Sequence, residues 1–203
     1  MAEHGALFLR AMFVENMPLT YFLGLCTFLA LSRRTDTAFG LGVAVFLVMG
    51  VTVPLNQMIY TAVLAPGAWR WAGMPDVDLS YLSLLTFIGV VAGSVQLLEM
   101  VLERYLPHVQ ASFGAFLPLL AIHCSILGGS LLMVERRYDL AEATAYGFGS
   151  GAGFALAVIM LGAVRARLAY ADLPAGLRGL GVAFLITGMM SLGFSAFAQM
   201  AAQ

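Results

Sequence analysis

Long apolar runs separated by short charged stretches are the main pattern of this chain. Between charged residues lie uncharged runs of 33, 20, 30 and 22 residues, and the last 25 residues carry no charge. A helix needs about 20 mostly apolar residues to cross the hydrocarbon core of a membrane. The first segment is long enough as well, although it contains Arg10, Glu15 and Asn16. The pattern therefore predicts six spanning helices, at residues 6–31, 38–64, 79–102, 108–133, 143–164 and 178–200.

The composition agrees with a protein that lies inside a membrane. Of the 203 residues, 61% are hydrophobic and 10% are charged, whereas soluble domains carry roughly a quarter charged residues. A net charge of -1 excludes a strongly basic nucleic-acid binder. Two cysteines cannot build a disulfide framework. We expect an all-α integral membrane protein with a single membrane domain.

The distribution of arginines predicts the orientation of the six helices. Cytoplasmic loops carry an excess of basic residues. The first, third and fifth loops together hold six arginines, namely Arg33, Arg34, Arg104, Arg165, Arg167 and Arg178. The opposite side holds four, namely Arg10, Arg70, Arg136 and Arg137. The count favours both termini on the outer face of the membrane.

The chain contains the same order of features twice, about one hundred residues apart. Each half has a proline, then a cysteine, a pair of arginines, and an aromatic residue followed by Gly-x-Gly. The first half has Pro18, Cys26, Arg33-Arg34 and Phe39-Gly-Leu-Gly42, and the second has Pro118, Cys124, Arg136-Arg137 and Tyr146-Gly-Phe-Gly149. Three helices are an odd number, so the two halves would insert in opposite directions. We therefore predict two inverted three-helix repeats, residues 1–104 and 105–203, as in many transport proteins.

The two cysteines are the strongest candidates for chemistry. Cys26 and Cys124 each lie inside a predicted span, one to two turns after a proline. Proline frees backbone groups that must be satisfied inside the protein. A buried cysteine is often only a small core residue, but a matched pair favours a joint role. Two thiolates are half of the four that iron–sulfur and tetrahedral metal sites take, so the pair forms either a disulfide or part of a metal site shared with another chain.

Three further residues are candidates for a role in the membrane. His123 could be a ligand in principle, although neighbours on a helix point about 100° apart from each other. Acids inside a membrane cost a few kcal/mol and are functional candidates. Glu15 either pairs with Arg10 or belongs to a cation route. Glu99 either extends to the membrane surface or contacts sodium, because Gln96 offers a second oxygen on the same face.

The glycine-rich stretch in the second half admits two interpretations. Gly147, Gly149, Gly151 and Gly153 alternate with other residues, as in some nucleotide-binding loops. Such a loop needs a preceding strand in a soluble sheet, which the pattern does not predict. Small residues four apart let membrane helices approach closely, and this is the interpretation we favour.

Several motifs resemble a known family. They are Phe13-Val-Glu-Asn-Met17, Phe22-Leu-Gly-Leu-Cys-Thr-Phe-Leu-Ala30, Thr37-Ala-Phe-Gly-Leu-Gly42, Val53-Pro-Leu-Asn-Gln57 and Tyr146-Gly-Phe-Gly149. Together they resemble the family of E subunits of sodium-translocating NADH:quinone reductases, from about Leu7 to Phe197. The D subunits of those complexes, and the A and E subunits of Rnf-type ferredoxin:NAD oxidoreductases, share the cysteine pattern.

The resemblance implies a specific cofactor and specific partners. In that family, the D and E subunits are inverted-repeat partners that each give two cysteines to an iron centre, a [2Fe-2S] cluster in the bacterial inner membrane. The matching positions are Cys26 and Cys124. His123 stands where an Asn is expected, and it could tune the centre's potential. NADH, flavins and quinone would be bound by other subunits of a six-subunit complex that exports sodium, so this chain would not be catalytic alone.

Three alternatives to this function stay open. The chain could be a subunit of an Rnf-type complex, or a standalone inverted-repeat secondary transporter. It could also be a scaffold that binds partner subunits and no cofactor. A transporter would need several polar groups at mid-membrane, and Glu15 and Glu99 are the acids offered. In each case the surroundings are membrane lipid, and nucleic acid is not an expected partner.

Overall fold

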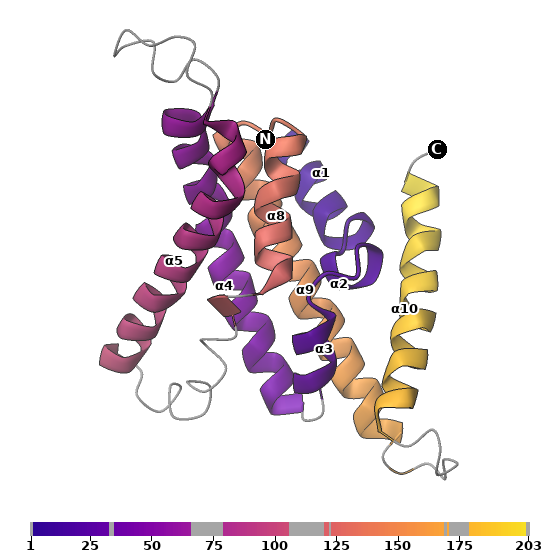
Figure 1. The fold of residues 1–203 in the computed structure, drawn as a ribbon. Helices are drawn as coiled ribbons and strands as arrows, with labels where there is room; N and C mark the ends of the chain where they lie inside the picture. The colour runs from indigo at the N-terminus through magenta and orange to yellow at the C-terminus, as the bar shows by residue number, and fades with distance from the viewer. Residues whose placement is uncertain are drawn as a thin grey trace, which may run out of the picture. The chain divides into compact units, whose positions relative to one another are not determined.

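The computed structural model describes residues 2–32, 35–65, 79–105, 120–121, 123–168, 170 and 179–201. Every regular element in these ranges is a helix (Figure 1). The contacts divide the chain into two compact units. Unit 1 is Met1–Leu47 with Phe148–Gln203, and unit 2 is Val48–Gly147. Two long helices, α4 (Thr35–Ile59) and α9 (Leu140–Leu168), contribute to both units.

The first predicted span is broken into four short helical pieces. They are α1 (Ala2–Leu9), the π-helical turn η1 (Arg10–Val14), α2 (Met17–Thr20) and α3 (Leu25–Leu31). The prediction of one continuous helix over 6–31 is therefore wrong. Pro18 has no N–H for a preceding helical turn, and Gly24 takes a left-handed conformation (φ 85°) that ends any helix running into it.

Three predicted spans are long apolar helices in the structure. They cover Thr37–Leu64, Ser80–Tyr105 and Leu140–Leu168, and each is long and apolar enough to cross a membrane. The first joins α4 to the π-helical turn η2 (Tyr60–Leu64). The second joins the short 3-10 turn η4 (Ser80–Leu82) to α5 (Ser83–Tyr105). The third is α9. The predictions at 38–64, 79–102 and 143–164 are confirmed as helices of this kind.

The other two predicted spans are represented by shorter apolar helices. The helix α10 (Leu180–Ala201) corresponds to the span predicted at 178–200. The helix α8 (Cys124–Glu135) corresponds to the second half of the span predicted at 108–133, whose first part lies outside the described residues, as does Pro118. The backbone at His123 is extended (φ -75°, ψ 111°), so α8 begins afresh at Cys124.

Unit 1 depends on glycines of α9 that allow two backbones to meet. A Cβ on Gly149 would lie 2.7 Å from the carbonyl oxygen of Phe8, and one on Gly153 would lie 2.7 Å from that of Met12. Contacts under 3.0 Å are closer than a Cβ tolerates. The helix-packing interpretation of these glycines is therefore confirmed. Their absent side chains let the N-terminal helices lie directly against α9.

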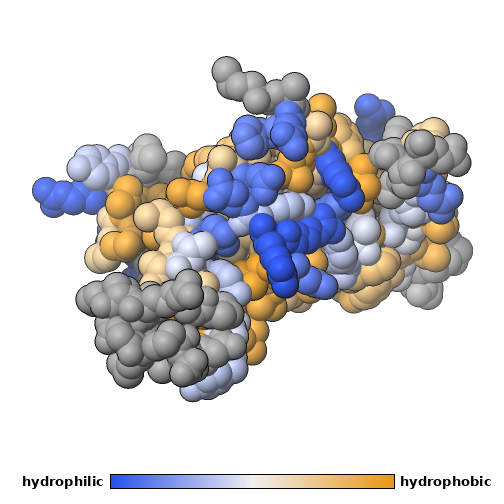
Figure 2. All heavy atoms as spheres, turned by 90° about the horizontal axis from the view of Figure 1, so that it is seen from above, coloured by the Kyte–Doolittle hydropathy of each residue, from blue (hydrophilic) through white to orange (hydrophobic). Residues whose placement is uncertain are grey.

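In unit 2, a close helix contact at a glycine and a pair of aromatic rings form part of the interior. A Cβ on Gly147 would lie 2.9 Å from the carbonyl oxygen of Met49, which shows how closely α9 approaches α4. The rings of Tyr60 and Phe87 are 6.4 Å apart. In contrast, only 17% of the apolar window in Ser80–Tyr105 is buried. Large hydrophobic areas reach the surface of the molecule (Figure 2), as expected for a chain surrounded by lipid or partner subunits.

Candidate metal-ligating site

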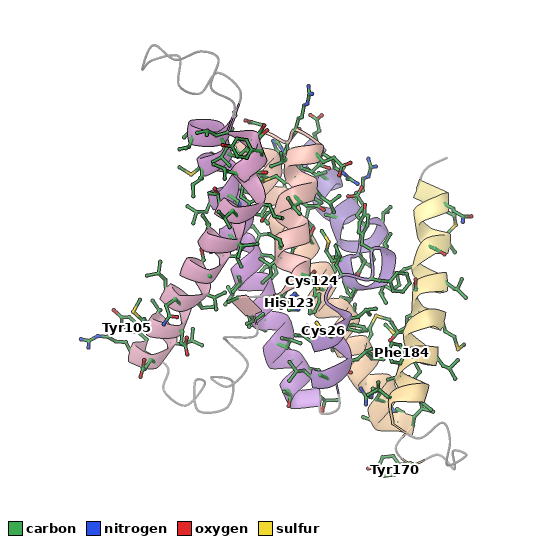
Figure 3. All side chains as sticks on the ribbon, in the orientation of Figure 1. Cys26, Tyr105, His123, Cys124, Tyr170 and Phe184 are labelled. Carbon is green, nitrogen blue, oxygen red and sulfur yellow. The ribbon has the colours of Figure 1, made fainter. Side chains whose placement is uncertain are left out.

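Cys26 lies in the first turn of the short helix α3, in unit 1. Gly24 precedes this helix in its left-handed conformation, and the hydroxyl of Thr27 donates to the Gly24 carbonyl at 3.0 Å. Cys26 is exposed and is not part of a disulfide. It lines a mainly apolar pocket of about 430 Å³, together with side chains of α3 and α10 (Figure 3). The pocket residues are Leu25, Cys26, Leu29, Ala30, Leu180 and Phe184.

The helix that carries Cys26 is fixed to α9 by two different contacts. The rings of Phe28 and Phe154 meet edge to face, with centroids 6.3 Å apart. At the other end of α3, the guanidinium of Arg165 donates to the Leu29 carbonyl at 2.9 Å and to the Ser32 hydroxyl at 2.8 Å. The last carbonyls of a helix have no partner within it and carry negative partial charge. Arg165 therefore satisfies and neutralises that end of α3.

Asn16 holds the broken segment that leads to Cys26. Its side chain is fully buried, and its Nδ2 donates to the Met12 carbonyl at 3.2 Å and to the Gly153 carbonyl at 2.8 Å. One amide thus binds a carbonyl of the π-helical turn and links this turn to α9. From the sequence, Asn16 was a polar residue in an apolar segment and part of a family motif, and Arg165 was placed in a loop. Neither contact with the distant helix has a local signal, because Asn16 and Gly153, like Arg165 and Leu29, lie more than 130 residues apart in the chain.

Cys124 is the first residue of α8, in unit 2. It is exposed and is not part of a disulfide, whereas its neighbours His123 and Ser125 are buried. The Nδ1 atom of His123 accepts a hydrogen bond from the Ser125 backbone N–H at 3.3 Å. His123 is thus the N-cap of α8 (Figure 3). Because it is extended rather than helical, the helical angle of about 100° between neighbours does not apply to this pair.

Each of the two cysteines presents an exposed thiol. Among the described residues, no group of three or more His, Cys, Asp and Glu side chains could hold a metal ion. An iron–sulfur cluster takes four thiolates, and this chain has two, both exposed and neither in a disulfide. A thiol that must bind a metal together with a second protein has to reach the surface of its own chain. The donor set therefore suits a centre completed by another subunit.

The candidate acids differ in their surroundings. Glu15 is buried (4% exposed), and its Oε1 lies 3.0 Å from Nε of Arg10, whose side chain is 64% exposed. The structure thus places Glu15 in an ion pair at the π-helical turn. Glu99 is half-buried on α5, one turn after the exposed Gln96. The predicted roles of both acids as cation contacts stay predictions.

Two buried carboxamides of α4, Asn56 and Gln57, contact α8 and the turn that follows it, in unit 2. Asn56 is fully buried, and its Nδ2 donates to the Ser130 hydroxyl at 2.7 Å. Gln57 is buried as well, and its Nε2 donates to the Tyr138 carbonyl. From the sequence, Asn56 and Gln57 were only part of a family motif. Two carboxamides in an apolar helix were the signal that could have marked them as more.

Comparison with known protein families shows to which family this chain belongs. A family model described as "Rnf-Nqr subunit, membrane protein" matches residues 5–201. The chain belongs to this family. Its Rnf-Nqr match includes both cysteine helices and every described helix from α3 to α9, so the family assignment covers the whole candidate site.

Relatives of this Rnf-Nqr chain are similar along almost its full length. It is 55% identical to proteins of Ectopseudomonas mendocina and Idiomarina loihiensis, and 54% identical to one of Marinobacter nauticus. Each match covers 97% of this chain and 98% of the relative. All three relatives are named as the E subunit of Na(+)-translocating NADH-quinone reductase. The recognition of this family from the sequence motifs is confirmed.

Proposed function

We propose that this Rnf-Nqr chain is the E subunit of a sodium-translocating NADH:quinone reductase in the bacterial inner membrane. In this role it relays electrons through an intramembrane [2Fe-2S] cluster that it shares with the homologous D subunit. The observation that carries the proposal is the pair of exposed thiols in a chain 55% identical to an E subunit over 97% of its length. The enzyme is the multisubunit complex, and NADH, flavins and quinone belong to other subunits.

The cluster supplies one-electron transfer when it is bound, and Cys26 and Cys124 would hold it. The remaining chemistry belongs to the protein around these thiols. His123 caps α8 and so fixes the backbone from which Cys124 projects. The first turn of α8 carries partial positive charge, which is a favourable environment for the negative charge of a metal-bound sulfur. On α3, the Arg165 guanidinium fixes the helix end three residues beyond Cys26.

The inverted repeat is part of the same proposal. It assigns residues 1–104 and 105–203 to two halves of opposite orientation, with six spans and both termini in the periplasm. One feature supports it: each cysteine helix is held at its far end by a long helix from the other half. Arg165 of α9 holds the end of α3, and Gln57 of α4 holds the residue Tyr138 beyond the end of α8. Such contacts from a helix of one half to a cysteine helix of the other half are expected where two related halves pack together.

The named alternatives are less well supported. A subunit of an Rnf-type complex belongs to the same family, but the relatives at 54–55% identity are named as the E subunit of the sodium-translocating reductase. A standalone secondary transporter needs charged groups arranged for a solute. The one buried carboxylate in the described residues, Glu15, is engaged by Arg10. The proposed complex of six subunits also provides partners for the exposed apolar faces of α5 and α10.

The test is to replace each cysteine by serine in the whole complex. A serine hydroxyl is a poor ligand for iron, whereas at a packing position the change costs only about 1–2 kcal/mol. Cys26→Ser and Cys124→Ser should each remove the iron signal of the membrane centre and NADH-driven quinone reduction. NADH oxidation by an artificial acceptor should persist, because that step precedes the membrane centre.

Ala30→Ser is the matched control for Cys26→Ser. Ala30 is exposed and lines the same pocket as Cys26, so this variant adds a hydroxyl there without removing a thiol. It should keep both iron and quinone reduction. An assembled Cys26→Ser complex with normal iron content and normal quinone reduction would contradict the proposed redox role.

A further inference from the structure

Unit 2 contains two buried carboxamide oxygens on adjacent residues of α4. They are Oδ1 of Asn56 and Oε1 of Gln57, and neither has a hydrogen-bond donor among the described residues. Asn56 is 0% exposed and Gln57 is 6% exposed. A buried acceptor that is left unsatisfied loses its hydration without replacement, which destabilises the folded state. Two of them on adjacent residues of a membrane helix call for a ligand.

The orientation of both amides is fixed by their neighbours. The Ser130 hydroxyl donates its proton to the Ile126 carbonyl at 3.2 Å, so it can only accept from Asn56. The Tyr138 carbonyl is an acceptor by nature and receives the Gln57 N–H. Each amide must therefore turn its NH2 group toward α8 or the turn after it. The oxygens Oδ1 and Oε1 are then the ends left over as acceptors.

The surroundings of these oxygens favour a cation. Pro54 lies inside α4 and has no N–H, so the carbonyl of the buried Gly50 loses its usual helical donor. Hard monovalent and divalent cations bind oxygen ligands of this type. Because the amide and carbonyl oxygens are neutral, the set suits a singly charged ion.

A comparison between the two units supports this assignment. In unit 1, the end of the cysteine helix α3 is held by the permanent cation Arg165. In unit 2, the carbonyl of Tyr138, beyond the end of α8, accepts from the neutral Gln57, while the Tyr138 hydroxyl accepts from the Arg136 guanidinium at 3.1 Å. Arg165 lies 18 residues after Gly147, and Gln57 lies 17 residues after the matching Gly40. An exchangeable cation beside Gln57 would occupy a place that a fixed positive charge holds in the other half.

We propose that Asn56 Oδ1 and Gln57 Oε1 are ligands of a sodium ion in unit 2, at the end of α8 that faces the periplasm in our orientation. This inference rests on the proposed function, since it names a site for the ion that the complex exports. The Gly50 carbonyl is the further oxygen that α4 can offer. Sodium bound here would lie on the same structural unit as Cys124.

The experiment uses the whole complex reconstituted in lipid vesicles. NADH-driven uptake of radioactive sodium is measured against sodium concentration. Asn56→Ala and Gln57→Ala should each raise the half-saturating sodium concentration at least fivefold. Asn56→Asp and Gln57→Glu keep an oxygen at each position and add negative charge, so each should lower the half-saturating sodium concentration.

A second measurement does not depend on activity. The purified complex is heated in sodium chloride and in choline chloride, and the two unfolding midpoints are compared. The stabilisation by sodium should shrink in both alanine variants. Thr86→Val on α5 is the control, because Thr86 donates to the Leu82 carbonyl of its own segment and leaves no acceptor unsatisfied. It should keep the wild-type response in both measurements.

The outcomes separate this site from the proposed function. Alanine variants that assemble with wild-type half-saturation and wild-type stabilisation overturn the site. If the alanine variants do not assemble, the charged variants decide instead. A half-saturating sodium concentration that is unchanged in Asn56→Asp and Gln57→Glu overturns the sodium site and indicates that a water molecule occupies these oxygens. A wild-type complex that takes up no sodium with NADH overturns the proposed function, and the stabilisation by sodium still decides the site.

Discussion

Single side chains stabilise the ends of the short helices in this membrane protein. Arg165 is half-buried in the last turn of α9, and its two donated hydrogen bonds join it to the end of α3. Counting arginines placed it in a loop, because the count treats every arginine as a group in contact with water. Whether a charge near a helix end faces solvent or another helix depends on a partner distant in sequence. That information is absent from the local pattern.

Replacing Arg165 should loosen the helix that carries Cys26. Arg165→Gln removes the charge from two hydrogen bonds, and hydrogen bonds to charged groups contribute about 1.5–3 kcal/mol. We expect a lower unfolding midpoint of the purified complex and a partial loss of iron. Arg165→Lys keeps the charge but not the forked geometry, so its losses should be smaller. Equal stability and iron content in Arg165→Gln and the wild type would show that the contact has no such role.

Helices of uniform hydropathy were predicted well, and broken ones were not. The apolar runs gave α4, α5, α9 and α10 within a few residues, since length and composition decide whether a helix can span a membrane. The break before α3 depends on a left-handed Gly24 and the π-helical turn at Arg10–Val14. Hydropathy does not report backbone dihedral angles. Pro18 and Gly24 were visible in the sequence, but their effect needed the structure.

The close crossing of α9 and the N-terminal helices gives a prediction at two glycines. A Cβ at Gly153 would meet the Met12 carbonyl at 2.7 Å, whereas a Cβ at Gly188 on α10 meets nothing within 4 Å. Overpacking typically costs about 1–3 kcal/mol, while Gly→Ala in an open helix position stabilises by up to about 1 kcal/mol. Gly153→Ala should lower the unfolding midpoint of the complex, and Gly188→Ala should not. Equal effects of the two changes would argue against the crossing.

At the scale of the whole chain, the sequence predicted the family and the membrane class but not the contacts between halves. The motifs around Cys26 and Gln57 were sufficient for recognition because short stretches carry them entirely. The exposure of both thiols was not predictable, since it depends on which helices lie beside them. The exposed apolar side of α5 likewise became visible only with the structure, and it marks surface that lipid or other subunits cover.

The orientation of the chain can be measured directly. Six arginines in the odd-numbered loops and four on the other side favour a periplasmic C-terminus. A phosphatase reporter that is active only outside the cytoplasm, fused after Gln203, should therefore be active in cells. A reporter that fluoresces only in the cytoplasm, fused at the same place, should be dark. The opposite pair of results would reverse the orientation and leave the even number of spans unchanged.

The crossing of Gly149 and Gly153 with the N-terminal helices also sets an order of events during synthesis. The first segment contains Arg10, Glu15 and Asn16 and is divided into short pieces, so it is a weak signal for the insertion machinery. Its final contacts, at Phe8 and Met12, are with residues made about 140 positions later. The ribosome must therefore complete most of α9 before the N-terminal helices can reach their final packing. The Cys26 helix, which depends on Phe154 and Arg165, is one of the last parts of the chain to form, although it is among the first to be translated.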